Sequence, residues 1–144
     1  MLKKPKKKRK KRRVKTSEQI EYDRLLKECD RIWSELVLKR DKHIDHYRMK
    51  RAVVAHHILS RSYFPCRWLL LNGISLAQGT HGYDAHGKGR AEFDRWIQRK
   101  WLGQEQWENL YTRKNNYMKR CIETLKVVKI SLERQREQST KEKP

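Results

Sequence analysis

The sequence predicts a mainly α-helical domain built around a small strand–strand–helix (ββα) element. Apolar residues recur at helical spacing across residues 17–40 and 116–138, which predicts a long amphipathic helix on either side of the centre. Between them, residues 51–58 and 74–76 are short apolar runs containing β-branched side chains, as strands do. Apolar residues make up 36% of the chain and charged residues 38%, so we expect a small core with partly solvated helices.

The first helix is predicted by its cap as well as by its periodicity. Thr16 or Ser17 can cap it, and Glu18 and Glu21 place negative charge in its first turn. We expect the apolar stripe to pack on its own domain, although the same face could form a homodimer. The stripe comprises Ile20, Tyr22, Leu25, Leu26, Cys29, Ile32, Trp33, Leu36 and Val37.

The two strands are separated by a loop and a turn. Residues 59–68 contain Ser, Arg, Tyr and Pro and are expected to form a loop. The dipeptide Asn72-Gly73 predicts a tight turn before the second strand. Tyr63 and Phe64, in the loop, are candidates to stack on DNA bases.

Helices are expected to follow the strands. A helix should start at His81 and be interrupted near residues 87–89, where two glycines lie. Gly103 should break the helix that follows. Three further helices are predicted, at residues 90–101, 104–112 and 116–138. The five tryptophans lie at helical spacing and are expected to pack between helices rather than stack on bases.

The chain therefore divides into one domain with two tails. We expect a disordered basic tail at residues 1–15, a single domain at 16–138 and a polar, fraying tail at 139–144. Three cysteines that form no CxxC pair, with no signal peptide, favour free thiols in a reducing cytoplasm. No apolar run approaches the roughly 20 residues of a membrane span, so no membrane partner is expected.

The charge of the chain points to a polyanion partner. The net charge is +20, and eleven lysines and arginines between positions 3 and 15 leave about +9 on the rest. Because basic side chains that neutralise phosphates release condensed counterions, such a chain is suited to bind nucleic acid. In the tail, the predicted DNA contacts are Lys6, Lys7, Lys8, Arg9, Lys10, Lys11, Arg12 and Arg13.

The histidines are concentrated where the ββα element is predicted. All six lie between positions 43 and 86, and His56 and His57 are neighbours on the first strand. Because neighbours on a strand point to opposite faces, one can bind a metal ion while the other takes a proton from water. Asn72 lies across the hairpin, where its amide could hold the second nitrogen of the base or the loop that carries it. His81 and His86 could close the metal site from the helix.

This spacing resembles that of the HNH, or ββα-metal, nucleases: His-His, fourteen residues, Asn, eight residues and His. Over residues 30–130 the chain is similar to the phage Rap/NinG group of recombination endonucleases. The residues that carry this resemblance are Ala55 to Arg61, Arg67-Trp68, Asn72-Gly73, Leu76, His81, Ala85-His86, Phe93 and Trp96-Ile97, with Trp33 and Arg40-Asp41 upstream.

The resemblance implies a divalent-metal-dependent DNA endonuclease that acts on branched or D-loop DNA in a phage-infected bacterium. His56, His81 and His86 would hold the cation, His57 would activate water and Asn72 would orient His57. Arg61 and Arg67 could clamp phosphates. The cation is expected to be Mg²⁺ or Mn²⁺, with Zn²⁺ or Ni²⁺ as alternatives.

The chain departs from the related proteins at two points. They usually carry two CxxC pairs that bind a structural zinc, whereas this chain has His43 and His46 in place of the first pair and Ala77 and Thr80 in place of the second. Because structural zinc needs four ligands, we expect none here. His81 and His86 are five residues apart, which an ordinary helix does not place on one face, so Asp84 is an alternative third ligand.

Two other interpretations remain open from the sequence. The chain could be a non-catalytic, basic nucleic-acid-binding protein with a degenerate HNH fold. It could also be a sequence-specific homing or restriction nuclease of the HNH class, although no added DNA-reading module is evident.

Overall fold

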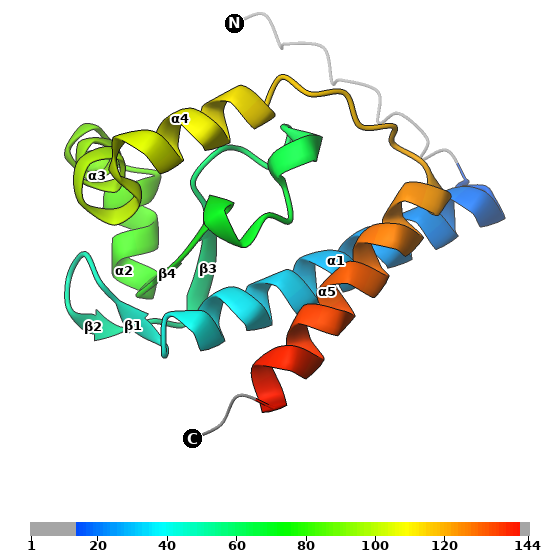
Figure 1. Cartoon of the computed structure of the whole chain (residues 1–144), viewed down its shortest axis with the longest axis horizontal. Coiled ribbons are helices and arrows are strands. Elements are labelled where there is room, and N and C mark those ends of the chain that lie inside the picture. The colour runs from blue at the N-terminus through cyan, green and yellow to red at the C-terminus, as the bar shows by residue number, and fades with distance from the viewer. Residues whose placement is uncertain (1–13, 142–144) are drawn as a thin grey trace, which may run out of the picture.

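The computed structural model describes residues 14–141, and it is mainly helical with two small antiparallel sheets (Figure 1). The predicted tail contacts from Lys6 to Arg13, and residues 142–144, lie outside the described residues. The predicted mainly helical class is confirmed.

The first helix, α1 (Ser17–Arg40), has the predicted bounds. The Thr16 hydroxyl caps it by accepting a hydrogen bond from the Gln19 amide at 3.2 Å. Its buried face carries six residues of the predicted stripe: Leu25, Cys29, Ile32, Trp33, Leu36 and Val37. Tyr22 and Leu26 are half-buried, whereas Ile20 is exposed.

The last helix, α5 (Ile122–Lys141), packs beside α1 and runs parallel to it. Successive ion pairs show the direction, because Glu21, Glu28 and Glu35 pair with Lys126, Lys129 and Arg136 in the same order. Both ends of the predicted helix were wrong. It begins six residues later than 116, because residues 117–120 form an extended connection that carries the chain from α4 back to the start of α1 (Figure 1). It also includes 139–141, where the Lys39 ammonium donates to the Ser139 carbonyl oxygen.

The predicted strand 51–58 is divided between two sheets. Strands β1 (Ile44–Asp45) and β2 (Lys50–Arg51) form a small hairpin, and β3 (Val54–His57) pairs with β4 (Gly73–Leu76). In the β3–β4 register, His56 lies opposite Ile74 and His57 opposite Gly73.

The expected tight turn at Asn72-Gly73 is not formed. Asn72 ends a 3₁₀ turn (Leu70–Asn72), and Gly73 begins β4 in an extended conformation. Glycine is needed at this position because a Cβ would lie 2.5 Å from Val37 Cγ2 and 2.8 Å from Trp33 Cζ2. Its absence lets β4 approach α1 closely.

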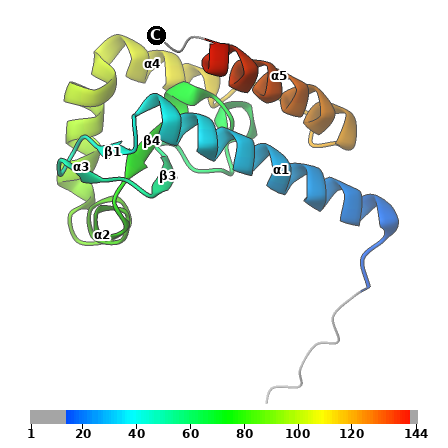
Figure 2. The ribbon, with the colours of Figure 1, turned by 90° about the horizontal axis from the view of Figure 1, so that it is seen from below.

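The remaining helices cover the other face of the β3–β4 hairpin. They are α2 (Gln78–Thr80), a wide π-type turn (His81–Ala85), α3 (Arg90–Trp96), a second π-type stretch (Ile97–Leu102) and α4 (Gly103–Arg113). The predicted break at Gly103 is confirmed, with φ +74°. In both ribbon views β3 and β4 lie between α1 and the α2–α3 end of the molecule (Figures 1 and 2).

The hairpin therefore separates two hydrophobic cores. The α1 core contains Leu25, Cys29, Ile32, Trp33, Leu36, Val37, Phe64, Trp68, Leu125 and Leu132. The α3 core contains Leu59, Cys66, Ile74, Leu76, Ala85, Phe93, Ile97, Leu102 and Leu110. Each face of β3 is thus set by a different group of helices.

Candidate metal centre

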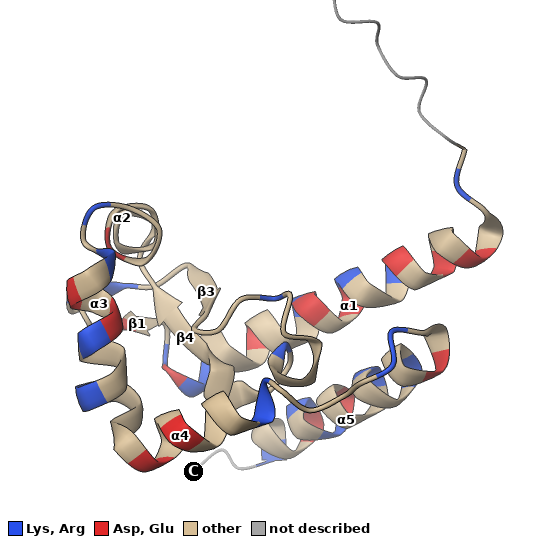
Figure 3. Cartoon of the chain, turned by 90° about the horizontal axis from the view of Figure 1, so that it is seen from above, with Lys and Arg blue, Asp and Glu red and all other residues tan. Residues whose placement is uncertain are grey.

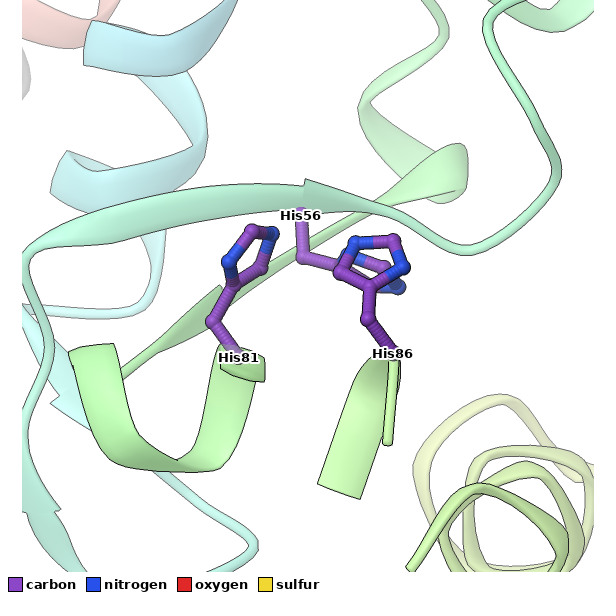
Figure 4. A group of neighbouring side chains, drawn as sticks. All are labelled: His56, His81 and His86. Atoms are coloured by element: carbon purple, nitrogen blue, oxygen red, sulfur yellow. The ribbon is translucent and has the colours of Figure 1, made fainter. Parts of the chain in front are cut away.

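Three of the predicted histidines converge. His56 on β3, His81 after α2 and His86 after the π-type turn point into a common space, and one nitrogen of each lies within 4.8 Å of the others (Figure 4). His56 is buried, His81 is half-buried and His86 is exposed. The rings lie edge to face, with centroids 4.6–5.3 Å apart.

The chemistry and spacing of these donors fit a metal ion. Imidazole nitrogens bind an ion at about 2.1 Å, so two of them in a tetrahedral set lie about 3.4 Å apart. The three nitrogens lie within 4.8 Å of one another and would need to close by up to about 1.4 Å to reach this spacing. The exposed His86 ring, which makes no side-chain hydrogen bond among residues 14–141, can supply that movement.

The five-residue spacing of His81 and His86 is explained by the backbone between them. Residues 81–85 form a π-type turn, which brings residues five apart onto one face. Gly87 allows the chain to leave this turn tightly, because a Cβ there would lie 2.6 Å from the Tyr83 carbonyl oxygen. The wide turn was not expected from the sequence.

Asp84, the alternative ligand, does not join the group. Its carboxylate is buried and accepts two hydrogen bonds from the Arg48 guanidinium, at 2.6 and 3.1 Å. The same turn that brings His86 to the site directs Asp84 to the β1–β2 hairpin. The donor set is therefore three imidazoles with no carboxylate.

His57 lies on the other face of β3. Its ring stacks on Trp33 of α1, with centroids 3.9 Å apart, and its Nε2 lies 2.9 Å from the Arg67 carbonyl oxygen. Because a carbonyl can only accept, Nε2 must carry the proton of the neutral ring, which leaves Nδ1 as the lone-pair nitrogen. The predicted separation of the two neighbouring histidines onto opposite faces is confirmed.

Both strand histidines are held neutral. Burial lowers the pKa of His56 to about 3, with further lowering by the charges that His86 and His81 would carry. Burial also lowers the pKa of His57 to about 4, although Asp30 and the Arg67 carbonyl oppose the shift. Burial lowers the pKa of His81 as well. Neutral imidazoles are the form that binds metal and accepts protons.

Asn72 does not hydrogen-bond to His57. Its fully buried amide accepts from the Leu59 N–H at 2.7 Å and donates to the carbonyls of Leu59 and Cys66, each at 3.1 Å. It thereby ties together the two ends of the loop that presents the Arg67 carbonyl to His57. Of the two roles considered for Asn72, the structure shows the one in which it holds the loop.

His56, His57, Arg61, His81, His86 and Arg90 line one cavity of about 570 Å³, which we call the histidine cavity. Arg61 is exposed at its rim, as a phosphate contact requires. Arg90, which the sequence did not single out among the many cations of residues 88–100, lies at the same rim.

Arg67, predicted as a second phosphate contact, instead pairs with a carboxylate of α1. Its guanidinium makes two hydrogen bonds to Asp30 of α1, at 2.6 and 2.9 Å, and its side chain is only 13% exposed. The prediction for Arg67 is corrected for this reason: the side chain fastens the loop to α1, and its main-chain carbonyl positions His57.

A buried carboxylate joins the segment around His43 and His46 to Ala77. Asp45, fully buried between His43 and His46, accepts from the amides of Tyr47 and Arg48, and its second oxygen accepts from the Ala77 amide, each at 3.0 Å. His43 is exposed, and His46 packs against Trp101. Asp45 thus connects the β1–β2 hairpin to the segment that precedes His81.

Three secondary predictions can be compared with the structure. Tyr63 is 39% exposed, but Phe64 is buried in the α1 core, so Phe64 is wrong as a stacking candidate. The three cysteines are free thiols, and burial raises the pKa of Cys66. Trp33 and Trp68 are buried, and the other three tryptophans are half-buried against the α3 core, as expected for helix packing.

Over residues 14–141, no helix combines the length and apolar character that crossing a membrane requires. Comparison of the chain with protein-family models, curated proteins and solved structures gives no match.

Proposed function

We propose that this protein is a metal-dependent DNA endonuclease of the HNH class. The observation that carries the proposal is the meeting of three imidazoles from separate segments in a cavity whose wall also contains a fourth, neutral imidazole. This is the division between metal ligands and proton acceptor that hydrolysis of a phosphodiester needs. In this proposal, the β3–β4 hairpin and the helical segment that follows it, α2 with its wide turn, would take the place of the ββα element of that class.

His56, His81 and His86 would hold the cation, which in such a site stabilises charge on the phosphate and on the leaving oxygen. His57 would take a proton from the attacking water at Nδ1, because Nε2 is committed to the Arg67 carbonyl. Its pKa of about 4 is low for a base at neutral pH, but phosphates entering the cavity would raise it by favouring the charged ring. Asn72, Arg67 and Trp33 are positioning residues for His57.

The donor set bears on which cation the protein prefers. Mg²⁺ favours oxygen ligands, whereas imidazole suits Zn²⁺, Ni²⁺ and other transition metals. With Asp84 paired to Arg48, the three-imidazole set favours a transition metal over the Mg²⁺ expected from the sequence. Zn²⁺ and Ni²⁺ fit this set better than Mn²⁺, which binds nitrogen donors most weakly among the divalent transition metals.

DNA is the proposed substrate because of the charge. The chain carries +20 in all, and Arg61 and Arg90 stand at the rim of the histidine cavity. The preference for branched DNA and the setting of phage recombination follow from the sequence resemblance alone.

Plasmid nicking tests the proposal. Purified protein is incubated with supercoiled plasmid and Mg²⁺, Mn²⁺, Ni²⁺, Zn²⁺ or EDTA, beside the His56→Ala/His81→Ala double variant. We expect nicking with a transition metal, none with EDTA, and none by the double variant. DNA binding without metal-dependent nicking under any of these conditions would reject the proposal in favour of the non-catalytic binder. Junction, flap, linear duplex and single-stranded substrates then define the preferred structure.

A further inference from the structure

A second hollow lies on the far side of the loop that follows β3. Its volume is about 410 Å³, and it is walled by Tyr63 and Pro65 from the loop and by Lys114, Tyr117 and Arg120 from the α4–α5 connection. We call it the tyrosine groove. It shares no lining residue with the histidine cavity.

The tyrosines of the groove are open to solvent. Tyr63 is 39% exposed and Tyr117 is 89% exposed, although the neighbouring Phe64 is 4% exposed in the α1 core. The loop thus buries one of its two adjacent aromatic rings and presents the other. Core packing accounts for Phe64, whereas most of the Tyr117 side chain is uncovered by the described residues.

The groove also carries positive charge, because Lys114 and Arg120 line it. Residues 113–120 contain Arg113, Lys114, Lys119 and Arg120 and no carboxylate (Figure 3). The Lys114 ammonium lies 3.3 Å from the centroid of the Tyr111 ring and 5.5 Å from that of Tyr63. The Arg120 guanidinium donates to the Ser62 carbonyl oxygen at 2.7 Å and lies over the Phe64 ring. These contacts hold Lys114 beside two exposed tyrosine rings and fix Arg120 against the loop that carries Tyr63.

The groove and the histidine cavity are joined by one short stretch of chain. Ser60 and Arg61 line the cavity, and Ser62 and Tyr63 line the groove. Cα atoms of successive residues are about 3.8 Å apart, so Arg61 and Tyr63 lie within about 8 Å of each other along the chain.

We propose that the tyrosine groove binds unpaired nucleotides of the DNA strand that continues from the histidine cavity. The inference rests on the proposed function and adds to it a second site on the same substrate. Bases stack on Tyr63 and Tyr117, and the cations of residues 113–120 neutralise the phosphates between them. A duplex does not fit this chemistry, because its base faces are already stacked and only phosphates and base edges are offered. The bound substrate is therefore DNA with a single-stranded segment beside the scissile phosphate.

Binding measured without metal separates the groove from catalysis. The full chain in EDTA is titrated into a fluorescein-labelled single-stranded oligodeoxynucleotide of mixed sequence and into a blunt duplex of the same sequence. We expect the Tyr63→Ala/Tyr117→Ala variant to bind the single strand about tenfold or more weakly, because aromatic stacking is lost, and the duplex within about twofold of the parent. The matched Tyr63→Phe/Tyr117→Phe variant should bind both as the parent does, because it keeps both rings.

A charge-matched pair and a single variant complete the test. Lys114→Ala should weaken single-strand binding more than Lys141→Ala, which removes an equal charge at the exposed end of α5. Tyr117→Ala alone should also weaken it, and the 89% exposure of this side chain means that the fold does not depend on it. Equal losses on single strand and duplex, or a loss in the Phe variant as large as in the Ala variant, would overturn the proposal.

The cleavage assay distinguishes failure of the groove from failure of the proposed function. If the parent cleaves a duplex with a single-stranded arm faster than a blunt duplex, the Tyr63→Ala/Tyr117→Ala variant should lose that advantage and keep its rate on the blunt duplex. Cleavage that retains the advantage in this variant overturns the groove but leaves the endonuclease in place. Metal-independent binding by the groove with no cleavage of either substrate keeps the groove and rejects the nuclease.

Discussion

His56 and His57 are neighbours in the chain, yet they belong to different parts of the molecule. His56 faces the α3 core, with its ring centroid 6.0 Å from that of Phe93, and meets His81 and His86. His57 faces the α1 core, where it stacks on Trp33. In the proposed function, one strand would supply both a metal ligand, His56, and the general base, His57. We call these the metal side and the base side of the site, and a different group of helices positions each. The two functions should therefore be separable by mutation.

The largest expected difference is between the histidines themselves. His57→Ala should lower kcat for metal-dependent nicking by about 10²–10⁴-fold, the usual contribution of a general base, and leave metal affinity unchanged. His81→Ala should weaken metal binding by more than about tenfold, since even the loss of a group that only supports a ligand has this effect. Calorimetric metal titration together with single-turnover nicking measures both quantities. Equal metal affinities in the two variants would show that metal binding and the base role are not separated between the two faces of β3.

Asp45 offers a test of the metal side alone. Its buried carboxylate accepts three backbone N–H groups and connects the β1–β2 hairpin to Ala77, four residues before His81. In Asp45→Asn an amide NH₂ would face one of these donors, which should cost about 1–3 kcal/mol of folding free energy and weaken metal binding. The stack of His57 on Trp33 should be unaffected. Urea unfolding with metal titration checks this, and Glu137→Gln, the same carboxylate-to-amide change at an exposed position of α5, is the matched control.

The pH dependence of stability compares the two histidines directly. In the metal-free protein both imidazoles are held neutral, whereas the unfolded chain takes up protons below about pH 6.5. Their stabilising effect is therefore complete above that pH and is lost as the pH falls, toward about 4 for His57 and about 3 for His56. Urea unfolding in EDTA from pH 7.5 to 4.5 should show declining stability, and His57→Phe, which keeps an aromatic ring beside Trp33, should decline less. An equally steep decline in that variant would contradict the assignment.

Sequence periodicity was sufficient for the parts of the fold that depend on neighbours in the chain. The bounds of α1 and the strand at residues 74–76 followed from apolar spacing and local caps, and the grouping of His56, His81 and His86 followed from motif spacing. These features depend on the backbone repeat, which a sequence displays directly. The start of α5 was missed because the chain must first return across the molecule, a constraint that local periodicity does not contain.

Contacts between distant residues could not be predicted in the same way. Asn72 was placed near the base, but its three hydrogen bonds to Leu59 and Cys66 depend on how the loop folds back. Arg67 was predicted to contact phosphate because its partner Asp30 lies 37 residues away in the sequence, and only the fold brings the two together. Polar side chains can satisfy the same hydrogen bonds with many partners, so only the folded chain determines which one is used.

The smallest expected effects come from two variants that keep both histidines, one on each side of β3. They test most directly whether the two cores position the two faces of β3 independently. Trp33→Phe preserves a ring beside His57 but removes the indole N–H that donates to the Leu69 carbonyl at 3.0 Å. We expect a cost of about 1 kcal/mol in stability and a small fall in kcat with metal affinity unchanged, because only the base side loosens. Phe93→Leu, on the α3 core, should do the reverse: metal affinity should fall by a few fold while single-turnover kcat at saturating metal stays at the parent value. If both variants alter kcat and metal affinity together, then β3 moves as one unit, and the two cores do not position its two faces independently.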